Sequence, residues 1–103
     1  MKPAFDQATW DGLAAREQEG LRLLVSRMEE DWTVAGLTRI IYGVPKLQAG
    51  LPLEADATAE LKAAQRALFA AIYQLVVGAD TGPRLPTLFL SLGAAKMRML
   101  LGG

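Results

Sequence analysis

The spacing of apolar residues in the second half of the chain most constrains its fold. Over residues 58–77 these residues recur at intervals of three and four: Leu61, Ala64, Leu68, Ala71, Ile72, Leu75 and Val76. Such spacing puts them on one face of a helix, whereas a half-buried strand would alternate apolar and polar residues. Asp56 or Thr58 can cap this helix, and Gly78 can end it. A helix is therefore predicted over residues 58–77.

Two helices are predicted before this one. The first spans residues 7–28 and stops near the acidic run at 29–31; its apolar stripe is Trp10, Leu13, Leu21, Leu24, Val25 and Met28. The second spans residues 33–42, with Asp31 or Thr33 as its cap and a buried face of Val34, Leu37, Ile40 and Ile41. Gly43 is expected to end it, because Pro45 prevents continuation. Residues 43–52 then form a turn-rich connector with room for one helical turn at 46–49.

Two short helices complete the predicted fold. Turn-forming residues fill the loop at 78–83, Pro86 suits the first turn of a helix ending at Leu92, and Gly93 separates that helix from a last one at 94–101. With 103 residues, 51% of them hydrophobic, the chain is long enough for one compact core. The predicted class is therefore all-α: a single domain, residues 1–103, forming a compact bundle of about five helices.

Histidine and cysteine are both absent, which removes most of the chemistry that side chains can perform. Without them there is no thiol nucleophile, no Ser-His-Asp arrangement and no thiolate or imidazole metal site. The glycine-rich patterns that hold phosphates, GxGxxG and GxxxxGK(S/T), are missing as well. No catalytic residue, bound cofactor or metal is therefore expected in this chain.

Nothing in the sequence predicts membrane insertion or export. The longest apolar stretch, residues 68–77, has ten residues and contains Gln74, whereas a membrane-spanning helix needs about twenty. The opening residues MKPAFDQATWDG lack the apolar core of a signal peptide. Because the chain has no cysteine for disulfide bonds either, a cytoplasmic protein is expected.

The charges are divided unevenly although they sum to zero. Residues 1–31 hold seven acids and four bases, net −3, and residues 32–103 hold seven bases and four acids, net +3. A basic part of this kind can face a polyanion. The alternative is a chance division. It is favoured because the pI of about 6.2 is far from the values above 9 that are typical of nucleic-acid-binding domains.

Arg84 is the strongest candidate for binding among the loop residues. It lies between Pro83 and Pro86, on a loop that leads into the N-terminus of the short helix ending at Leu92. Backbone N–H groups at such an end attract anions, and an arginine beside them can hold a phosphate with two hydrogen bonds. Arg84 can equally pair with Asp80, or cap the carbonyl groups at the end of the helix at 58–77.

Three consecutive segments have a more specific pattern. They are IIYGVPKLQAGLP (residues 40–52), ELKAAQRALFAAIYQLVVG (60–78) and ADTGPRLPTLFLSLG (79–93). An LF-x-x-I/L-Y helix that ends in glycine, a loop with GPR and a short apolar helix follow one another, here as Leu68-Phe69, Ile72-Tyr73, Gly78, Gly82-Pro83-Arg84 and residues 88–93. In this order and spacing the segments resemble the carboxy-terminal end of class I lysyl-tRNA synthetases. The resemblance covers about residues 32–101.

That resemblance implies an anticodon-binding role. The last domain of these synthetases is a helical bundle that binds the anticodon region of tRNA, and their amino-terminal Rossmann-type domain activates lysine with ATP. Neither the HIGH motif nor the KMSKS motif of the catalytic domain is present in this chain. The resemblance therefore implies a non-catalytic tRNA-binding domain. Its expected partners are lysine tRNA and a catalytic synthetase domain, to which ATP would bind.

Candidate contacts follow from how single-stranded loops are recognised. Such loops are read by stacking on aromatic rings and by arginine or lysine contacts to phosphates and base edges. The candidates are Arg39, Lys46, Lys62, Arg66 and Arg84, with Tyr42 and Tyr73 as candidate stacking surfaces. Of the two tyrosines, Tyr73 fits better as a core residue with its hydroxyl at the boundary. The alternative function is a protein-interaction or dimerisation module without nucleic-acid binding, which the acidic first helix would suit.

Overall fold

Helices make up all the regular structure of residues 2–102, the part of the chain that the computed structural model describes. Six α-helices follow one another, and a 3-10 helix, η1, extends the second. Their bounds are α1 Gln7–Asp11, α2 Ala15–Arg27, η1 Met28–Asp31, α3 Val34–Gln48, α4 Ala59–Val76, α5 Leu85–Leu92 and α6 Ala94–Leu100. These residues contain no strand, so the predicted all-α class is confirmed.

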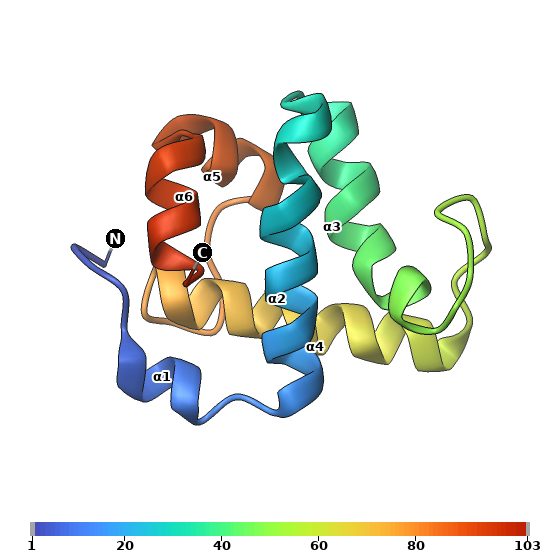
Figure 1. The fold of residues 1–103 in the computed structure, drawn as a ribbon, viewed down its shortest axis with the longest axis horizontal. Coiled ribbons are helices and arrows are strands. Elements are labelled where there is room, and N and C mark those ends of the chain that lie inside the picture. Colours follow the sequence, from blue (N-terminus) through green and yellow to red (C-terminus); the bar gives the residue numbers. More distant parts are fainter. Residues whose placement is uncertain (1, 103) are drawn as a thin grey trace.

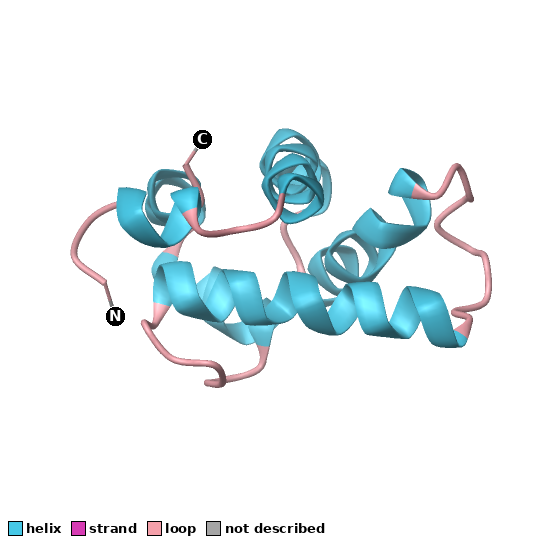
Figure 2. Ribbon diagram, turned by 90° about the horizontal axis from the view of Figure 1, so that it is seen from below, coloured by secondary structure: helices cyan, strands magenta, loops and turns pink. Residues whose placement is uncertain are grey.

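Helix α4 runs along the long axis of the molecule, and α2 and α3 cross it (Figure 1). Helix α2 packs against both α3 and α4, and α3 also packs against α5. The loop at 49–58 projects at the end of the molecule where α4 begins (Figure 2). Within residues 2–102, no helix combines the length and the apolar character that crossing a membrane requires.

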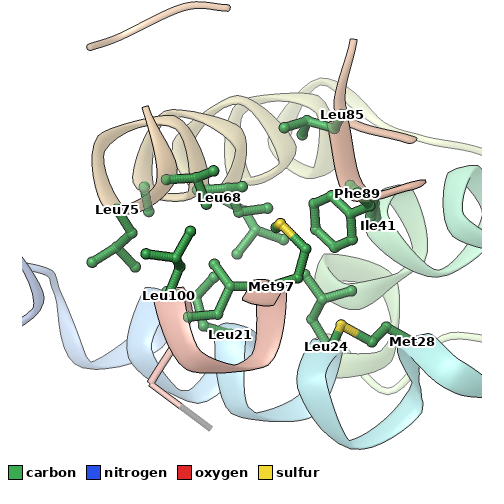
Figure 3. Close-up of a cluster of buried hydrophobic side chains, with 14 of the residues drawn as sticks. Leu21, Leu24, Met28, Ile41, Leu68, Leu75, Leu85, Phe89, Met97 and Leu100 are labelled. Atoms are coloured by element: carbon green, nitrogen blue, oxygen red, sulfur yellow. The ribbon is translucent and has the colours of Figure 1, made fainter. Parts of the chain in front are cut away.

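The hydrophobic core lies between α4 and the helices above it. Figure 3 shows its central side chains, which are Leu21 and Leu24 of α2, Met28 of η1, Ile41 of α3, Leu68 and Leu75 of α4, Leu85 and Phe89 of α5, and Met97 and Leu100 of α6. None of these ten is more than 5% exposed. Burial of each such side chain stabilises the fold by about 1.5–3 kcal/mol. Five helices are thereby held in one core.

The later helices begin and end close to where the sequence predicts. The Thr58 hydroxyl oxygen caps α4 by accepting a hydrogen bond from the N–H of Leu61 at 3.2 Å. After α4, Gly78 has a φ of +82°, a left-handed conformation that glycine adopts without strain. The short helices α5 and α6 are also confirmed, with Gly93 between them.

The first predicted helix is wrong in its middle. Instead of one helix over residues 7–28, α1 ends at Asp11 and α2 begins at Ala15. Gly12 is a poor helix former. The carbonyl oxygen of Trp10 accepts hydrogen bonds from the Leu13 N–H at 3.0 Å and from Gln18 Nε2 at 2.8 Å, which satisfies the end of α1. This break accounts for six helices where about five were predicted.

The predicted end of the second helix is also wrong. Helix α3 passes through Gly43 and Pro45 and ends at Gln48, so residues 46–48 belong to it. Burial explains this, because Gly43 and Pro45 both lie inside, and the Leu53 side chain packs where a Cβ of Gly43 would sit. Apolar burial thus outweighs the roughly 3 kcal/mol that an interior proline costs. At the other end Val34, predicted to be buried, is 57% exposed.

Replacing the cap of α4 tests how much that helix depends on its first turn. Thr58→Ala is expected to lower the free energy of unfolding by about 1 kcal/mol, because the N–H of Leu61 loses its partner. Urea denaturation followed by circular dichroism measures this loss. Thr81→Ala, in the exposed loop after α4, is the control and should change stability by less than about 0.5 kcal/mol. Equal losses in the two variants would contradict the capping role.

Candidate RNA-binding surface

One side of α4 carries cations in its first half and aromatic rings in its second. Lys62, Arg66, Phe69 and Tyr73 follow at intervals of four, three and four residues, which places them on one face of the helix. Lys62 and Arg66 are exposed, and the two rings are half-buried. We call this row the α4 stripe. A polyanion lying along it would meet charges first and flat apolar rings next.

Helix α3 places Tyr42 against this stripe. The rings of Tyr42 and Phe69 meet edge to face, with centroids 4.9 Å apart and planes inclined by 65°. Gln65 Nε2 of α4 donates a hydrogen bond to the carbonyl oxygen of Tyr42 at 2.8 Å, which ties the two helices together at this point. Tyr42 remains 43% exposed and is the one exposed aromatic residue within 2–102.

Gln65 is a positioning residue that the sequence reasoning missed. It is 7% exposed, the one buried polar or charged residue in the part of the chain that the structure describes. It stands between Leu61 and Leu68 on the apolar stripe of α4. A polar residue at such a position needs a hydrogen-bond partner inside the protein. The sequence alone shows this polar residue on an apolar stripe, but it does not identify Tyr42 as the hydrogen-bond partner.

Arg84 stands at the edge of a hollow between α3, α4 and α5. The hollow has a volume of about 130 Å³, and its walls are Thr38, Tyr42, Phe69, Tyr73, Arg84, Leu85 and Pro86. Arg84 is the exposed residue that precedes the first turn of α5. The Tyr73 hydroxyl donates a hydrogen bond to the carbonyl oxygen of Pro83 at 2.7 Å, which fixes the loop next to Arg84. The structure therefore brings Tyr42 and Arg84, distant in sequence, to one site.

The two structural roles that the sequence leaves open for Arg84 are both taken by other groups. Asp80 accepts a hydrogen bond from the Gln74 side chain, and Arg84 forms no salt bridge with it. Near the end of α4, the carbonyl oxygen of Tyr73 accepts from the backbone N–H groups of Val77 and Gly78. The guanidinium group of Arg84 is left without an ion-pair partner among residues 2–102.

Tyr73 lies as predicted, with its ring packed against the core and its hydroxyl at the boundary. Partial burial raises the pKa of this hydroxyl, and the neighbouring Tyr42 adds to the effect. The phenol is therefore uncharged at neutral pH. It serves to hold the loop in front of Arg84 and closes one wall of the hollow.

Arg39 and Lys46 are engaged elsewhere. Arg39 forms a salt bridge with Glu54, and Lys46 Nζ donates a hydrogen bond to the carbonyl oxygen of Leu53 at 3.2 Å. A backbone hydrogen bond, followed by the Arg39 guanidinium, lowers the pKa of the Glu54 carboxyl. Both candidates thus hold the loop at 49–58, and the structure does not bring them to the hollow.

In the described part of the chain, the basic residues of the α4 stripe and of the hollow are unpaired, whereas two acids of the run at 29–31 are paired. Lys62, Arg66 and Arg84 form no salt bridge with any residue from 2 to 102. In the acidic run, by contrast, Glu29 pairs with Arg98, and Glu30 pairs with Arg27. The acids are thus partly neutralised by their own neighbours. Lys62, Arg66 and Arg84 therefore place unpaired positive charge on the α4 stripe and at the hollow.

A larger hollow of about 500 Å³ lies between α2 and α4, and it is a poorer site for an anion. Ala63, Ala64 and Ala67 line it, and its single arginine, Arg16, is accompanied by two glutamates. The smaller hollow at Arg84 has no acidic residue among its walls. No cluster of three or more metal-binding side chains occurs within residues 2–102.

Comparison with known proteins agrees with the resemblance that the sequence motifs carry. Over 88 residues the chain is 50% identical to a lysine–tRNA ligase of Streptomyces coelicolor, an alignment that covers 82% of this chain. It spans only 15% of the length of that ligase. No family model matches the chain, and no solved structure matches it. The chain is therefore homologous to one part of a lysine–tRNA ligase.

Proposed function

We propose that this chain is a non-catalytic, cytoplasmic tRNA-binding domain of the class I lysyl-tRNA synthetase type, which holds the anticodon region of lysine tRNA. The homology to part of a lysine–tRNA ligase supports a synthetase-related role. The observation that carries the proposal is the row of unpaired bases, Lys62, Arg66 and Arg84, beside the exposed ring of Tyr42. Lysine activation with ATP would belong to a partner catalytic domain.

The physical basis is the chemistry of a single-stranded loop. Its phosphates are drawn to lysine and arginine, and its unstacked bases lie flat on aromatic rings. On the α4 stripe both kinds of group stand next to each other. In this proposal Arg39 and Lys46 bind tRNA less strongly than the unpaired bases, because each must first break its interaction with the loop at 49–58. The exposed Arg39–Glu54 pair is worth only about 0–1 kcal/mol, so a phosphate can replace Glu54.

Salt dependence of tRNA binding tests the proposal. The triple variant Lys62→Gln, Arg66→Gln and Arg84→Gln is expected to bind tRNA at least about tenfold more weakly than the wild-type chain. Its plot of log affinity against log salt should be shallower by about 2, because each phosphate contact to a single strand contributes about 0.7 to the slope. A filter-binding or anisotropy titration across a range of salt concentrations measures both quantities.

A second triple variant separates the proposed site from general electrostatic attraction. Arg16→Gln, Arg22→Gln and Lys96→Gln remove the same charge from α2 and α6, and these residues are exposed. This control should keep the wild-type slope. Equal weakening by both triples would contradict a localised interface, and a wild-type chain that binds no tRNA at low salt would overturn the proposed function itself.

A further inference from the structure

We infer that the hollow at Arg84 is a pocket for a single unstacked nucleobase, whose attached phosphate is held by Arg84 at the start of α5. This inference rests on the proposed function and makes it specific. Tyr42, Phe69 and Tyr73 form the walls for the base, and Arg84 stands at the rim. The ligand class is a nucleotide in a single-stranded segment, because a base inside a duplex is stacked on both sides and cannot enter.

The size and the walls of the hollow fit one ring system. Its volume of about 130 Å³ is well below the roughly 300–1,000 Å³ of sites for drug-sized ligands. Three of its seven lining residues are aromatic, and Leu85 and Pro86 add apolar surface. Stacking on an aromatic side chain binds any of the bases, since every base has a flat π-face. The hollow is therefore expected to accept a base with little preference for its identity.

The contact between the aromatic walls leaves ring faces free for a ligand. Because Tyr42 and Phe69 meet edge to face, at least one of the two rings keeps both of its faces free of the other. Within residues 2–102, Tyr42 is also one of the four large apolar side chains that are exposed. Gln65 holds the backbone of Tyr42 from beneath, through the hydrogen bond to its carbonyl oxygen. The backbone that carries this exposed ring is thus fixed before a ligand arrives, and the ring itself packs against Phe69.

The phosphate position follows from two features at the start of α5. Arg84 is adjacent to the first turn, and no side chain caps that end of the helix, so N–H groups there remain available to an anion. The guanidinium group has no ion-pair partner in the described part of the chain and can form two parallel hydrogen bonds to phosphate oxygens. Pro83 and Pro86 restrict the backbone on either side. Base and phosphate would therefore be held at neighbouring points of one rigid site.

A fluorescent base reports directly on this pocket. The probe is a short single-stranded RNA with 2-aminopurine at one internal position, whose emission falls when the base stacks on a ring. The wild-type chain is expected to quench it, and Tyr42→Ala should remove the quenching and weaken binding about tenfold. Tyr42→Phe should retain both, because the ring and not the hydroxyl is used. Met99→Ala, which removes an exposed apolar side chain from α6, is the matched control and should behave as wild type.

The salt dependence then separates this inference from the proposed function. Tyr42→Ala should weaken binding without changing the salt slope, whereas Lys62→Gln with Arg66→Gln should lower the slope and leave the quenching of bound RNA intact. Undiminished quenching in Tyr42→Ala, or equal affinity for the same RNA annealed to its complement, would overturn the base pocket while tRNA binding stands. Absence of all RNA binding would overturn the proposed function.

Adenosine monophosphate distinguishes a free nucleotide from one in a strand. Nuclear magnetic resonance titration should show that it shifts the signals of Tyr42 and Arg84 only weakly, at concentrations far above those that saturate with RNA. Tight binding of the mononucleotide together with no RNA binding would mean that the hollow serves a free nucleotide. That result would contradict both the strand-bound ligand inferred here and the proposed function.

Discussion

Phe89→Ala is expected to lower the free energy of unfolding by about 3–5 kcal/mol, because a fully buried ring is removed from the centre of the core. Figure 3 shows Phe89 among the side chains of several helices, beside Ile41 of α3. The ring also lies against Trp32, with centroids 6.4 Å apart. Since small domains have about 5–15 kcal/mol of stability in total, this variant should unfold at a much lower urea concentration.

The matched substitution at the same position is Phe89→Leu, which keeps most of the buried volume. It is expected to cost less than about 1.5 kcal/mol, as conservative hydrophobic exchanges do. A loss in Phe89→Ala no larger than in Phe89→Leu would show that the ring is not central to the core. Because α5 begins next to Arg84, Phe89→Ala should also weaken RNA binding at temperatures where the variant is still folded.

Local sequence predicts a helix well when its pattern and its ends agree. For α4 the apolar stripe, the Thr58 cap and the terminating Gly78 all indicate the same segment, and the helix is found at Ala59–Val76. For α3 the local signals are misleading. Gly43 and Pro45 usually end a helix, yet here both are buried, and Leu53 packs over Gly43 from the following loop. A contact with a loop whose path is unknown cannot be read from periodicity.

The candidate surface could be predicted only in part for the same reason. Lys62 and Arg66 fall on one face of α4 by their spacing alone. That Tyr42 and Arg84 share one hollow depends on how α3 crosses α4 and on where the loop before α5 runs. Likewise, Arg39 forms a salt bridge with Glu54, a residue of the projecting loop. The sequence therefore indicates which side chains can bind an anion, and the packing decides which of them stay free.

Gly36→Ala is expected to destabilise the protein by about 1–3 kcal/mol, although helix propensity alone predicts a gain of about 1 kcal/mol. A Cβ on Gly36, in the first turn of α3, would overlap the side chain and the backbone carbonyl oxygen of Asp31. That carbonyl group cannot easily move, because it accepts a hydrogen bond from the N–H of Thr33 at 2.9 Å. The overlap would also disturb the bond from the N–H of Gly36 to the Thr33 cap. Urea denaturation measures whether the free energy of unfolding falls or rises.

Gly43→Ala is the control for this destabilisation, because it places a methyl group in the same helix against a side chain that can move. The overlap at Gly43 is with the Leu53 Cδ2 atom, the end of a flexible side chain. A change of rotamer can relieve it, and the propensity gain of about 1 kcal/mol then offsets most of the cost. Gly43→Ala should therefore be close to wild type in stability. If instead Gly36→Ala is as stable as wild type, the turn at η1 must shift freely, and the fixed position of the Asp31 carbonyl group, argued from its hydrogen bond to Thr33, would be wrong.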